Sequence, residues 1–281
     1  MTINNKAIRI LDHSITMPEA SIPVDESIIV VGDSTKLVDY LPLSFASLIF
    51  IDPPYGQVVD ISWDKVRLED FFTKNFAIKL TQRLSDTGSL YVCCGEGEKS
   101  DSYSYFKSIF IDYLHFKDHI TISKERGIGN RKGWMYAREE MQWWVYDNNA
   151  FIWNEDAQYS TERRKRDGNG PVKPGQNGKE RKSPFKRLTN VWTDISFMAP
   201  DVVQRQKFHK TPKPVKWIER VILANTKPCD IVFDCFAGAM TTWEACRRTG
   251  RRFVGIELSM DHVVKGIEFF EKQNNGQLEL I

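Results

Sequence analysis

The stretch Ile231–Glu257, IVFDCFAGAMTTWEACRRTGRRFVGIE, carries the strongest indication of the fold. An apolar run ends in Asp234, small residues lead into a helical pattern, and a second apolar run, Arg252–Glu257, follows. Runs that are apolar on both faces are typical of buried parallel strands. A strand, a small-residue turn, a helix and a strand ending in an acid predict a nucleoside-binding βαβ unit, with Glu257 at the ribose hydroxyls. An ordinary βαβ crossover is the alternative, because the turn is poor in glycine.

The same pattern continues outward along the chain. Three more short apolar runs, Ile28–Val31, Ser47–Ile51 and Ser89–Cys93, predict further buried strands. Alternation of strands and helices predicts an α/β fold with a doubly wound, mostly parallel sheet of the Rossmann-like type, whose ligands bind outside the carboxyl ends of the strands. The predicted helices are Leu68–Leu84, Tyr105–Leu114, Val215–Ala224, Thr241–Arg248 and His262–Lys272.

A basic, glycine- and proline-rich segment interrupts this alternation. We expect an N-terminal extension at 1–26, two halves of one main domain at 27–147 and 206–281, and a loop-rich insertion at 148–205. Between Thr161 and Arg187 the insertion holds ten basic and three acidic residues, a net charge of +7, against −5 for the rest of the chain. Such asymmetry indicates a polyanion-binding segment, with a solvated loop as the alternative.

The composition is that of a globular protein outside the membrane. Apolar residues make up 41% of the 281 residues and charged residues 27%, and no apolar run is long enough for a transmembrane helix. The first 20 residues lack the apolar stretch of a signal peptide, so a cytoplasmic location is expected. An odd number of cysteines without a CxxC pair predicts reduced, mostly buried thiols and no metal site. The cysteines are Cys93, Cys94, Cys229, Cys235 and Cys246.

A stiff, acid-bearing turn follows the run Ser47–Ile51. Asp52-Pro53-Pro54-Tyr55 contains two consecutive prolines, which fix φ twice and remove two backbone donors. The carboxylate and a proline carbonyl can accept hydrogen bonds from an NH2 group, while the ring can stack on a flat substrate. The turn therefore suits a planar, amine-bearing substrate. A strand-ending turn with a helix-capping Asp is the alternative.

A third candidate, His209-Lys210-Thr211-Pro212-Lys213-Pro214, enters the predicted helix Val215–Ala224. Histidine, threonine and lysine side chains at a helix entry can meet an anionic or carboxylate-bearing ligand. A structural histidine is the alternative.

In this order the motifs resemble a known family, the N6-adenine and N4-cytosine amino-methyltransferases of DNA. The resemblance is to the circularly permuted β group, in which the catalytic motif precedes the cofactor motif, and it spans most of Ile28–Phe270. The matching motifs are Gly32–Ser34 (GDS), Asp52–Gly56 (DPPYG), Gly88–Val92 (GSLYV), Met141–Asn148 (MQWWVYDN), His209–Pro214 (HKTPKP), Phe236–Thr242 (FAGAMTT) and Gly250–Ser259 (GRRFVGIELS).

The resemblance implies a role for each matching position. The catalytic loop would be Asp52, Pro53, Pro54 and Tyr55: the Asp52 carboxylate and the Pro53 carbonyl would bind the target amino group, and Tyr55 would stack on the base. S-adenosylmethionine would be the cofactor, and residues 206–281 the cofactor-binding half. Its predicted contacts are Asp33, His209, Thr211, Lys213, Asp234, Phe236, Gly238 and Glu257. The nucleic-acid contacts predicted in the basic insertion are Arg163, Arg164, Lys165, Arg166, Lys179, Arg181 and Lys182.

Three motifs or positions depart from the family pattern. Met240 stands where the family usually has a second glycine, Cys235 stands where it has proline, and HKTPKP replaces the commoner HPTQKP. A side chain at position 240 is expected to crowd the turn, because glycine lets the backbone approach its ligand. Altered cofactor affinity is the predicted consequence.

The function that the resemblance implies is a site-specific DNA methyltransferase acting on the exocyclic amino group of a flipped base. Adenine N6 is favoured over cytosine N4, because aspartate at position 52 goes more often with adenine in the family. Double-stranded DNA, a second copy in a homodimer and a cognate restriction endonuclease are the expected partners. The alternatives are an N4-cytosine methyltransferase, an RNA or protein-glutamine methyltransferase, and a catalytically inactive DNA-binding protein of this fold.

Overall fold

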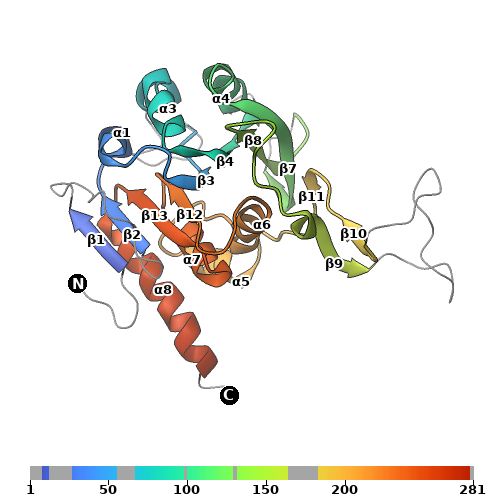
Figure 1. The fold of residues 1–281 in the computed structure, drawn as a ribbon. Coiled ribbons are helices and arrows are strands. Elements are labelled where there is room, and N and C mark those ends of the chain that lie inside the picture. The colour runs from blue at the N-terminus through green and yellow to red at the C-terminus, as the bar shows by residue number, and fades with distance from the viewer. Residues whose placement is uncertain are drawn as a thin grey trace, which may run out of the picture.

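A single nine-stranded sheet forms the centre of the computed structural model, which describes residues 8–12, 27–55, 67–97, 100–128, 132–163 and 183–278 (Figure 1). Strand β8 runs antiparallel to both of its neighbours, and every other neighbouring pair is parallel. The predicted mostly parallel sheet is therefore confirmed. Across the sheet the strands are β1 (Ile8–Asp12), β2 (Ser27–Val31), β13 (Arg252–Glu257), β12 (Ile231–Asp234), β3 (Ala46–Ile51), β4 (Leu84–Cys94), β8 (Tyr136–Val145), β7 (His115–Ile128) and β11 (Val191–Trp192).

Helices cover both faces of the sheet, as Figure 1 shows. One face carries α1 (Ser34–Leu37), α3 (Lys74–Thr81) and α4 (Ser102–Phe110), and the other carries α6 (Val215–Asn225), α7 (Thr241–Thr249) and α8 (Met260–Leu278). Successive residues of a strand pack on opposite faces of the sheet. Ile28 and Val30 belong to one buried cluster, and Ile29 belongs to the other. The short helices α2 (Leu68–Phe71) and α5 (Pro200–Arg205) complete the set of helices in the described residues.

The sequence prediction for Leu68–Leu84 was wrong in its length. The segment forms two helices, because the Thr73 hydroxyl accepts a hydrogen bond from Phe76 N at 3.2 Å and begins α3 anew. Leu84 already belongs to β4. The apolar residues of this segment still pack together, since the rings of Phe72 and Phe76 form an edge-to-face pair with centroids 5.0 Å apart.

The segment predicted as an insertion contributes to the sheet at its far edge. Strand β11 pairs with β7, while β9 (Tyr159–Arg163) and β10 (Phe185–Arg187) form a separate antiparallel pair. A second small pair, β5 (Glu96–Gly97) and β6 (Ser100–Asp101), follows β4. Within the described ranges, no helix is both long enough and apolar enough to cross a membrane.

Candidate functional site

Three acids lie at the carboxyl ends of adjacent parallel strands. Asp52 follows β3, Asp234 ends β12 and Glu257 ends β13, and β12 lies between the other two. Carboxyl ends of parallel strands meet at one edge of the sheet, where ligands of such folds bind. Burial, together with the nearby charges of Asp52 and Glu257, raises the pKa of Asp234 to about 7, against the lowering effect of its hydrogen bonds. The two halves of the predicted site are thus electrostatically in contact.

The turn after β3 holds its carboxylate between two partners. The Tyr55 hydroxyl donates to Asp52 Oδ1 at 2.7 Å, and Lys213 Nζ lies 2.9 Å from Asp52 Oδ2. The Asp52 side chain is 21% exposed, so a ligand can reach it. Burial and the Asp52 charge raise the pKa of Tyr55 well above its ordinary value, so the phenol stays protonated and donates.

Lys213 joins the turn after β3 to strand β8. Its side chain is 8% exposed, and Nζ lies 3.7 Å from Glu139 Oε2. Glu139 is also ion-paired with Lys124 of β7. The sequence assigned Lys213 to the cofactor, and that assignment stays a prediction. The geometry brings its ammonium group to Asp52.

The turn between β12 and α7 is held by the other two acids. Asp234 accepts hydrogen bonds from Phe236 N at 2.9 Å and from the Thr242 hydroxyl at 2.6 Å. Glu257 accepts from Gly238 N at 2.7 Å through Oε2. Its other oxygen, Oε1, accepts from the amide of Ser259 at 3.0 Å. Carboxylates aimed at backbone amides fix the shape of the turn.

His209 packs against this turn at Gly238, a position that requires glycine. Gly238 has φ +48°, and a Cβ there would lie 3.0 Å from His209 Nε2. Burial and the neighbouring His262 ring lower the pKa of His209 to about 4, so the imidazole is neutral at physiological pH. Thr211 is exposed on the same segment. The structure therefore brings His209 and Gly238 together, and their contact with the cofactor stays a prediction.

Met240 occupies the left-handed region, with φ +61° and ψ 26°, directly before α7. Its side chain is fully buried in the core shared with α6 and α8. A Cβ added at Gly266 of α8 would lie 2.7 Å from Met240 Cβ. The methionine side chain therefore packs into the space that Gly266 leaves, and its burial accounts for a side chain at this position of the turn.

Asp33 follows β2 at the neighbouring end of the sheet. Gly32 N donates to the Glu257 carbonyl at 2.9 Å, which keeps this segment beside β13. Asp33 caps α1 through Thr35 N at 3.0 Å, and it lines a cavity of about 370 Å³ between α1 and α3. Phe236 packs against Phe71 and Phe76, which also line that cavity.

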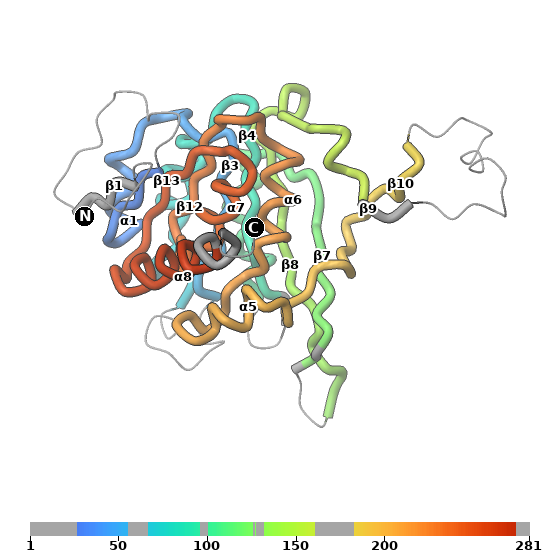
Figure 2. Tube along the Cα trace, turned by 90° about the horizontal axis from the view of Figure 1, so that it is seen from below, coloured from blue at the N-terminus to red at the C-terminus, as the bar shows by residue number. Residues whose placement is uncertain are grey.

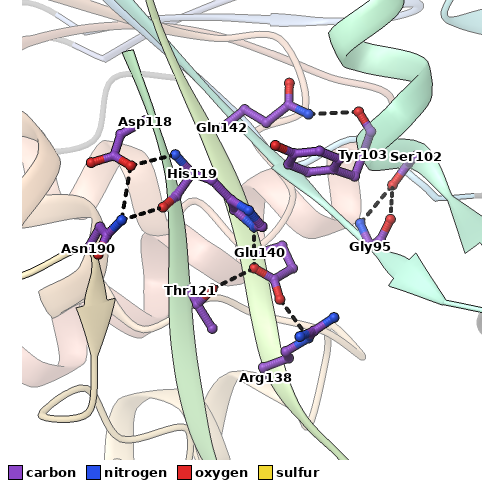
Figure 3. Close-up of polar contacts among 10 residues, drawn as sticks. All are labelled: Gly95, Ser102, Tyr103, Asp118, His119, Thr121, Arg138, Glu140, Gln142 and Asn190. Carbon is purple, nitrogen blue, oxygen red and sulfur yellow. Dashed lines mark hydrogen bonds and ion pairs between the residues drawn. The ribbon is translucent and has the colours of Figure 1, made fainter. Parts of the chain in front are cut away.

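Strand β8 carries a second buried acid that the sequence did not single out. Glu140 is fully buried and its carboxylate meets His119 Nε2 at 2.5 Å, the Thr121 hydroxyl at 2.9 Å and Arg138 Nε at 2.6 Å (Figure 3). Neighbouring residues of a strand point to opposite faces, so Glu139 and Glu140 serve different clusters. In the sequence, the two adjacent acids Glu139 and Glu140 were the only indication of these clusters. The sequence does not show which residues pair with them.

The predicted nucleic-acid residues fall outside what the structure describes. Arg163 ends β9, but its side chain lies outside the described part, as do Arg164, Lys165, Arg166, Lys179, Arg181 and Lys182 in full. The described residues show a different exposed feature: strands β7 and β8 extend past the rest of the sheet (Figure 2), and Trp134 before β8 is fully exposed.

Comparison with known proteins agrees with this arrangement. The sequence model of a family described as DNA methylase matches residues 46–267. The Type II methyltransferase M1.MboII of Moraxella bovis is 29% identical over 238 residues, covering 80% of this chain and 89% of that protein. The DNA adenine methyltransferase YhdJ of Escherichia coli is 26% identical over 247 residues, covering 85% and 81%.

Two solved structures share the fold. The cytosine-N4-specific PvuII DNA methyltransferase superposes with a TM-score of 0.64 at 17% identity, covering 86% of this chain and 85% of that one. The M1.HpyAVI–SAM complex superposes with a TM-score of 0.57 at 19% identity, covering 86% and 97%.

Proposed function

The chain belongs to the DNA methylase family, and we propose that it transfers a methyl group from S-adenosylmethionine to adenine N6 in double-stranded DNA. The observation that carries the proposal is the Asp52 carboxylate at the carboxyl edge of the sheet, one strand away from the turn held by Asp234 and Glu257. A carboxylate that can accept hydrogen bonds from a planar amine thus lies beside a turn suited to a nucleoside.

The residues of the turn fit the cofactor. Gly238 has a positive φ in a cradle that a Cβ would fill, and Glu257 offers a carboxylate at the end of β13, where ribose hydroxyls bind in folds of this kind. Asp33 and Phe236 border the neighbouring cavity. When bound, S-adenosylmethionine supplies a methyl group on a sulfonium, which is already activated toward a nucleophile. The task that remains for the chain is positioning.

Asp52 and Pro53 would orient the amino group of the target base. The lone pair of an exocyclic amine is delocalised into the ring, which makes the nitrogen a poor nucleophile. Hydrogen bonds from its two hydrogens to Asp52 and to the Pro53 carbonyl favour a pyramidal nitrogen whose lone pair can attack in line. Tyr55, whose hydroxyl donates to Asp52 Oδ1, would stack on the base. The base has to leave the duplex to reach this turn.

Adenine is favoured over cytosine by the aspartate at position 52 and by YhdJ, described as an adenine methyltransferase, at 26% identity. Cytosine N4 is the second candidate, because the PvuII enzyme, described as cytosine-N4-specific, shares the fold with a TM-score of 0.64. Analysis of methylated bases separates the two.

The two halves of the main domain and the insertion would each have a separate function. We assign residues 27–147 to the catalytic half, 206–281 to the cofactor-binding half, and 148–205 to target recognition. DNA contact by Arg163, Arg164, Lys165, Arg166, Lys179, Arg181 and Lys182 rests on their charge, which would make affinity fall steeply with salt. Deletion of 163–182 should therefore weaken DNA binding at low salt, and unchanged affinity would refute this assignment.

The Asp52→Ala variant tests the catalytic role. It should bind DNA and S-adenosylmethionine as the wild type does and transfer no methyl group, because the amino group loses its acceptor. Asp39→Ala, on the exposed surface, is the matched control and should keep full activity. Full activity of Asp52→Ala would rule out the proposed chemistry.

A further inference from the structure

The tip of the β7–β8 hairpin, residues 132–136, exposes three consecutive large apolar side chains. Trp134 is 100% exposed, Met135 is 69% exposed and Tyr136 is 36% exposed. Single exposed apolar residues are ordinary on a protein surface, whereas contiguous ones next to polar residues mark an interaction site. An indole ring also buries a large area when a partner covers it. The hairpin tip therefore has the composition of a surface that a partner covers.

The register of the sheet puts the hairpin tip on the same side as the proposed site of methyl transfer. Glu140 of β8 pairs with the last residue of β4, so the residues before it lie past the carboxyl edge of the sheet (Figure 2). Glu139 lies at this edge, since its Oε2 is 3.7 Å from Lys213 Nζ, which contacts Asp52. Trp134 precedes Glu139 by five residues, a reach of up to about 17 Å in an extended chain.

Ion pairs and a hydrogen bond hold the base of the hairpin. Lys124 of β7 pairs with Glu139 of β8. Arg138 pairs with the buried carboxylate of Glu140 (Figure 3). On the β7 side, Glu125 Oε2 accepts a hydrogen bond at 3.1 Å from a backbone amide of the segment before α5. The body of the protein therefore fixes the direction in which the hairpin tip points.

The charge of the hairpin suits a polyanion. The two cations at its base, Lys124 and Arg138, neutralise acids of β8. Between them the sequence has three basic residues and one acid, a net charge of +2: Arg126, Arg131, Lys132 and Glu125. Lys132 is exposed and lies two residues before Trp134. A second copy of the chain fits this surface poorly, because a two-fold contact would bring two positive tips together.

We propose that the hairpin tip is a docking surface for double-stranded DNA and that the Trp134 ring packs against bases beside the flipped target. The inference rests on the proposed function, because a base that reaches Asp52 has to leave a duplex that lies across this edge of the sheet. A two-stranded β-ribbon fits into the major groove of such a duplex. An aromatic ring can stack on the base faces that a flipped base leaves uncovered.

The test is duplex binding by Trp134→Ala, measured by fluorescence anisotropy of labelled mixed-sequence DNA over a range of salt concentrations. The substitution leaves the core intact, because Trp134 is fully exposed. Loss of a contact between the ring and the bases should weaken binding by roughly 5- to 100-fold. The slope of log Kd against log salt should stay that of the wild type, because no phosphate contact is lost. Trp134→Phe keeps an aromatic ring and should retain most of the affinity.

The fluorescence of Trp134 reports directly whether DNA covers the ring. This signal is the difference between the emission of the wild type and that of Trp134→Phe. Acrylamide should quench it readily in the free chain, where the ring is fully exposed. Saturating duplex DNA should protect it from acrylamide, because the ring then lies against the bases.

Tyr40→Ala is the matched control for removal of an exposed aromatic ring. Tyr40 is 59% exposed and lies in the segment that leads to the start of β3, away from the carboxyl edge of the sheet. Its replacement should leave both the DNA affinity and the protection of Trp134 unchanged.

Equal DNA affinity of Trp134→Ala and the wild type would overturn the inference, as would an equal loss in Tyr40→Ala or a Trp134 signal that DNA does not protect. A dimer that dissociates in Trp134→Ala at unchanged DNA affinity would assign the hairpin tip to a second copy of the chain instead. A wild-type chain that binds DNA and methylates no base would overturn the proposed function, while anisotropy and quenching would still decide the role of the hairpin tip.

Discussion

Replacement of Gly266 by alanine tests how the fold accommodates Met240. The new Cβ would lie 2.7 Å from Met240 Cβ and Cγ and 2.9 Å from the Ala239 carbonyl oxygen. These atoms sit at or near the backbone and cannot move aside as a flexible side-chain end can. Overpacking of this kind costs about 2 to 3 kcal/mol, and the better helix propensity of alanine returns up to about 1 kcal/mol. Gly266→Ala should therefore lower the free energy of unfolding by about 1 to 3 kcal/mol.

The assay is urea unfolding of four proteins: the wild type, Gly266→Ala, Met240→Gly and the double variant. In the Met240→Gly background the 2.7 Å contacts are gone, so Gly266→Ala should cost little or stabilise the chain. Met240→Gly should not tighten S-adenosylmethionine binding, because the buried side chain fills the core. A Gly266→Ala variant more stable than the wild type would refute the packing argument.

Two further predictions concern buried charge. His209→Gln removes an imidazole whose pKa is about 4 in the folded chain, against 6.5 in the unfolded chain. Neutral His209 therefore contributes fully to the free energy of unfolding above pH 6.5, and this contribution is lost as the pH falls toward 4. The wild type should thus lose about 3 kcal/mol relative to the variant between pH 7 and pH 4, measured by urea unfolding, and a difference independent of pH contradicts this. Arg205→Met breaks a fully buried ion pair with Glu244 and should lower the free energy of unfolding by about 3 kcal/mol, the lower end for such pairs, because Arg248 still contacts Glu244. The double variant R205M/E244Q should recover part of this stability. An unchanged denaturation midpoint of Arg205→Met would argue against a stabilising pair.

Local patterns predicted the central strands of the sheet because these strands are apolar on both faces. The runs at Ile28–Val31, Ser47–Ile51 and Ile231–Asp234 all lie within observed strands. Cys93 and Cys94 point into different cores, as the alternation of side chains along a strand requires. The long strand β7 was not predicted, because His115–Ile128 mixes charged and apolar residues without a clean period.

The site was predicted in its parts and not in its connections. Asp52, Asp234 and Glu257 could be placed on one edge because parallel strands end together. The contact of Lys213 with Asp52 joins residues 161 positions apart, and sequence spacing says nothing about such a distance. Glu139 was missed for the same reason, since an acid in a strand shows no partner until the neighbouring chain segments are placed.

Met240 is another residue whose contacts could not be predicted from the sequence around it. A missing glycine predicted a crowded turn, because only the turn was visible in the sequence. The fold supplies a glycine from another element, Gly266 of α8, which makes room for the side chain. Compensation across 26 residues of chain depends on packing between elements.

The most direct measurement of the central claim is transfer of tritiated methyl groups from S-adenosylmethionine to DNA, RNA and protein in parallel, followed by base analysis of the DNA. The wild type should label DNA alone, as N6-methyladenine, and Asp52→Ala should label nothing. Label in RNA or protein, or no label from a wild-type chain that binds both S-adenosylmethionine and DNA, would contradict the account.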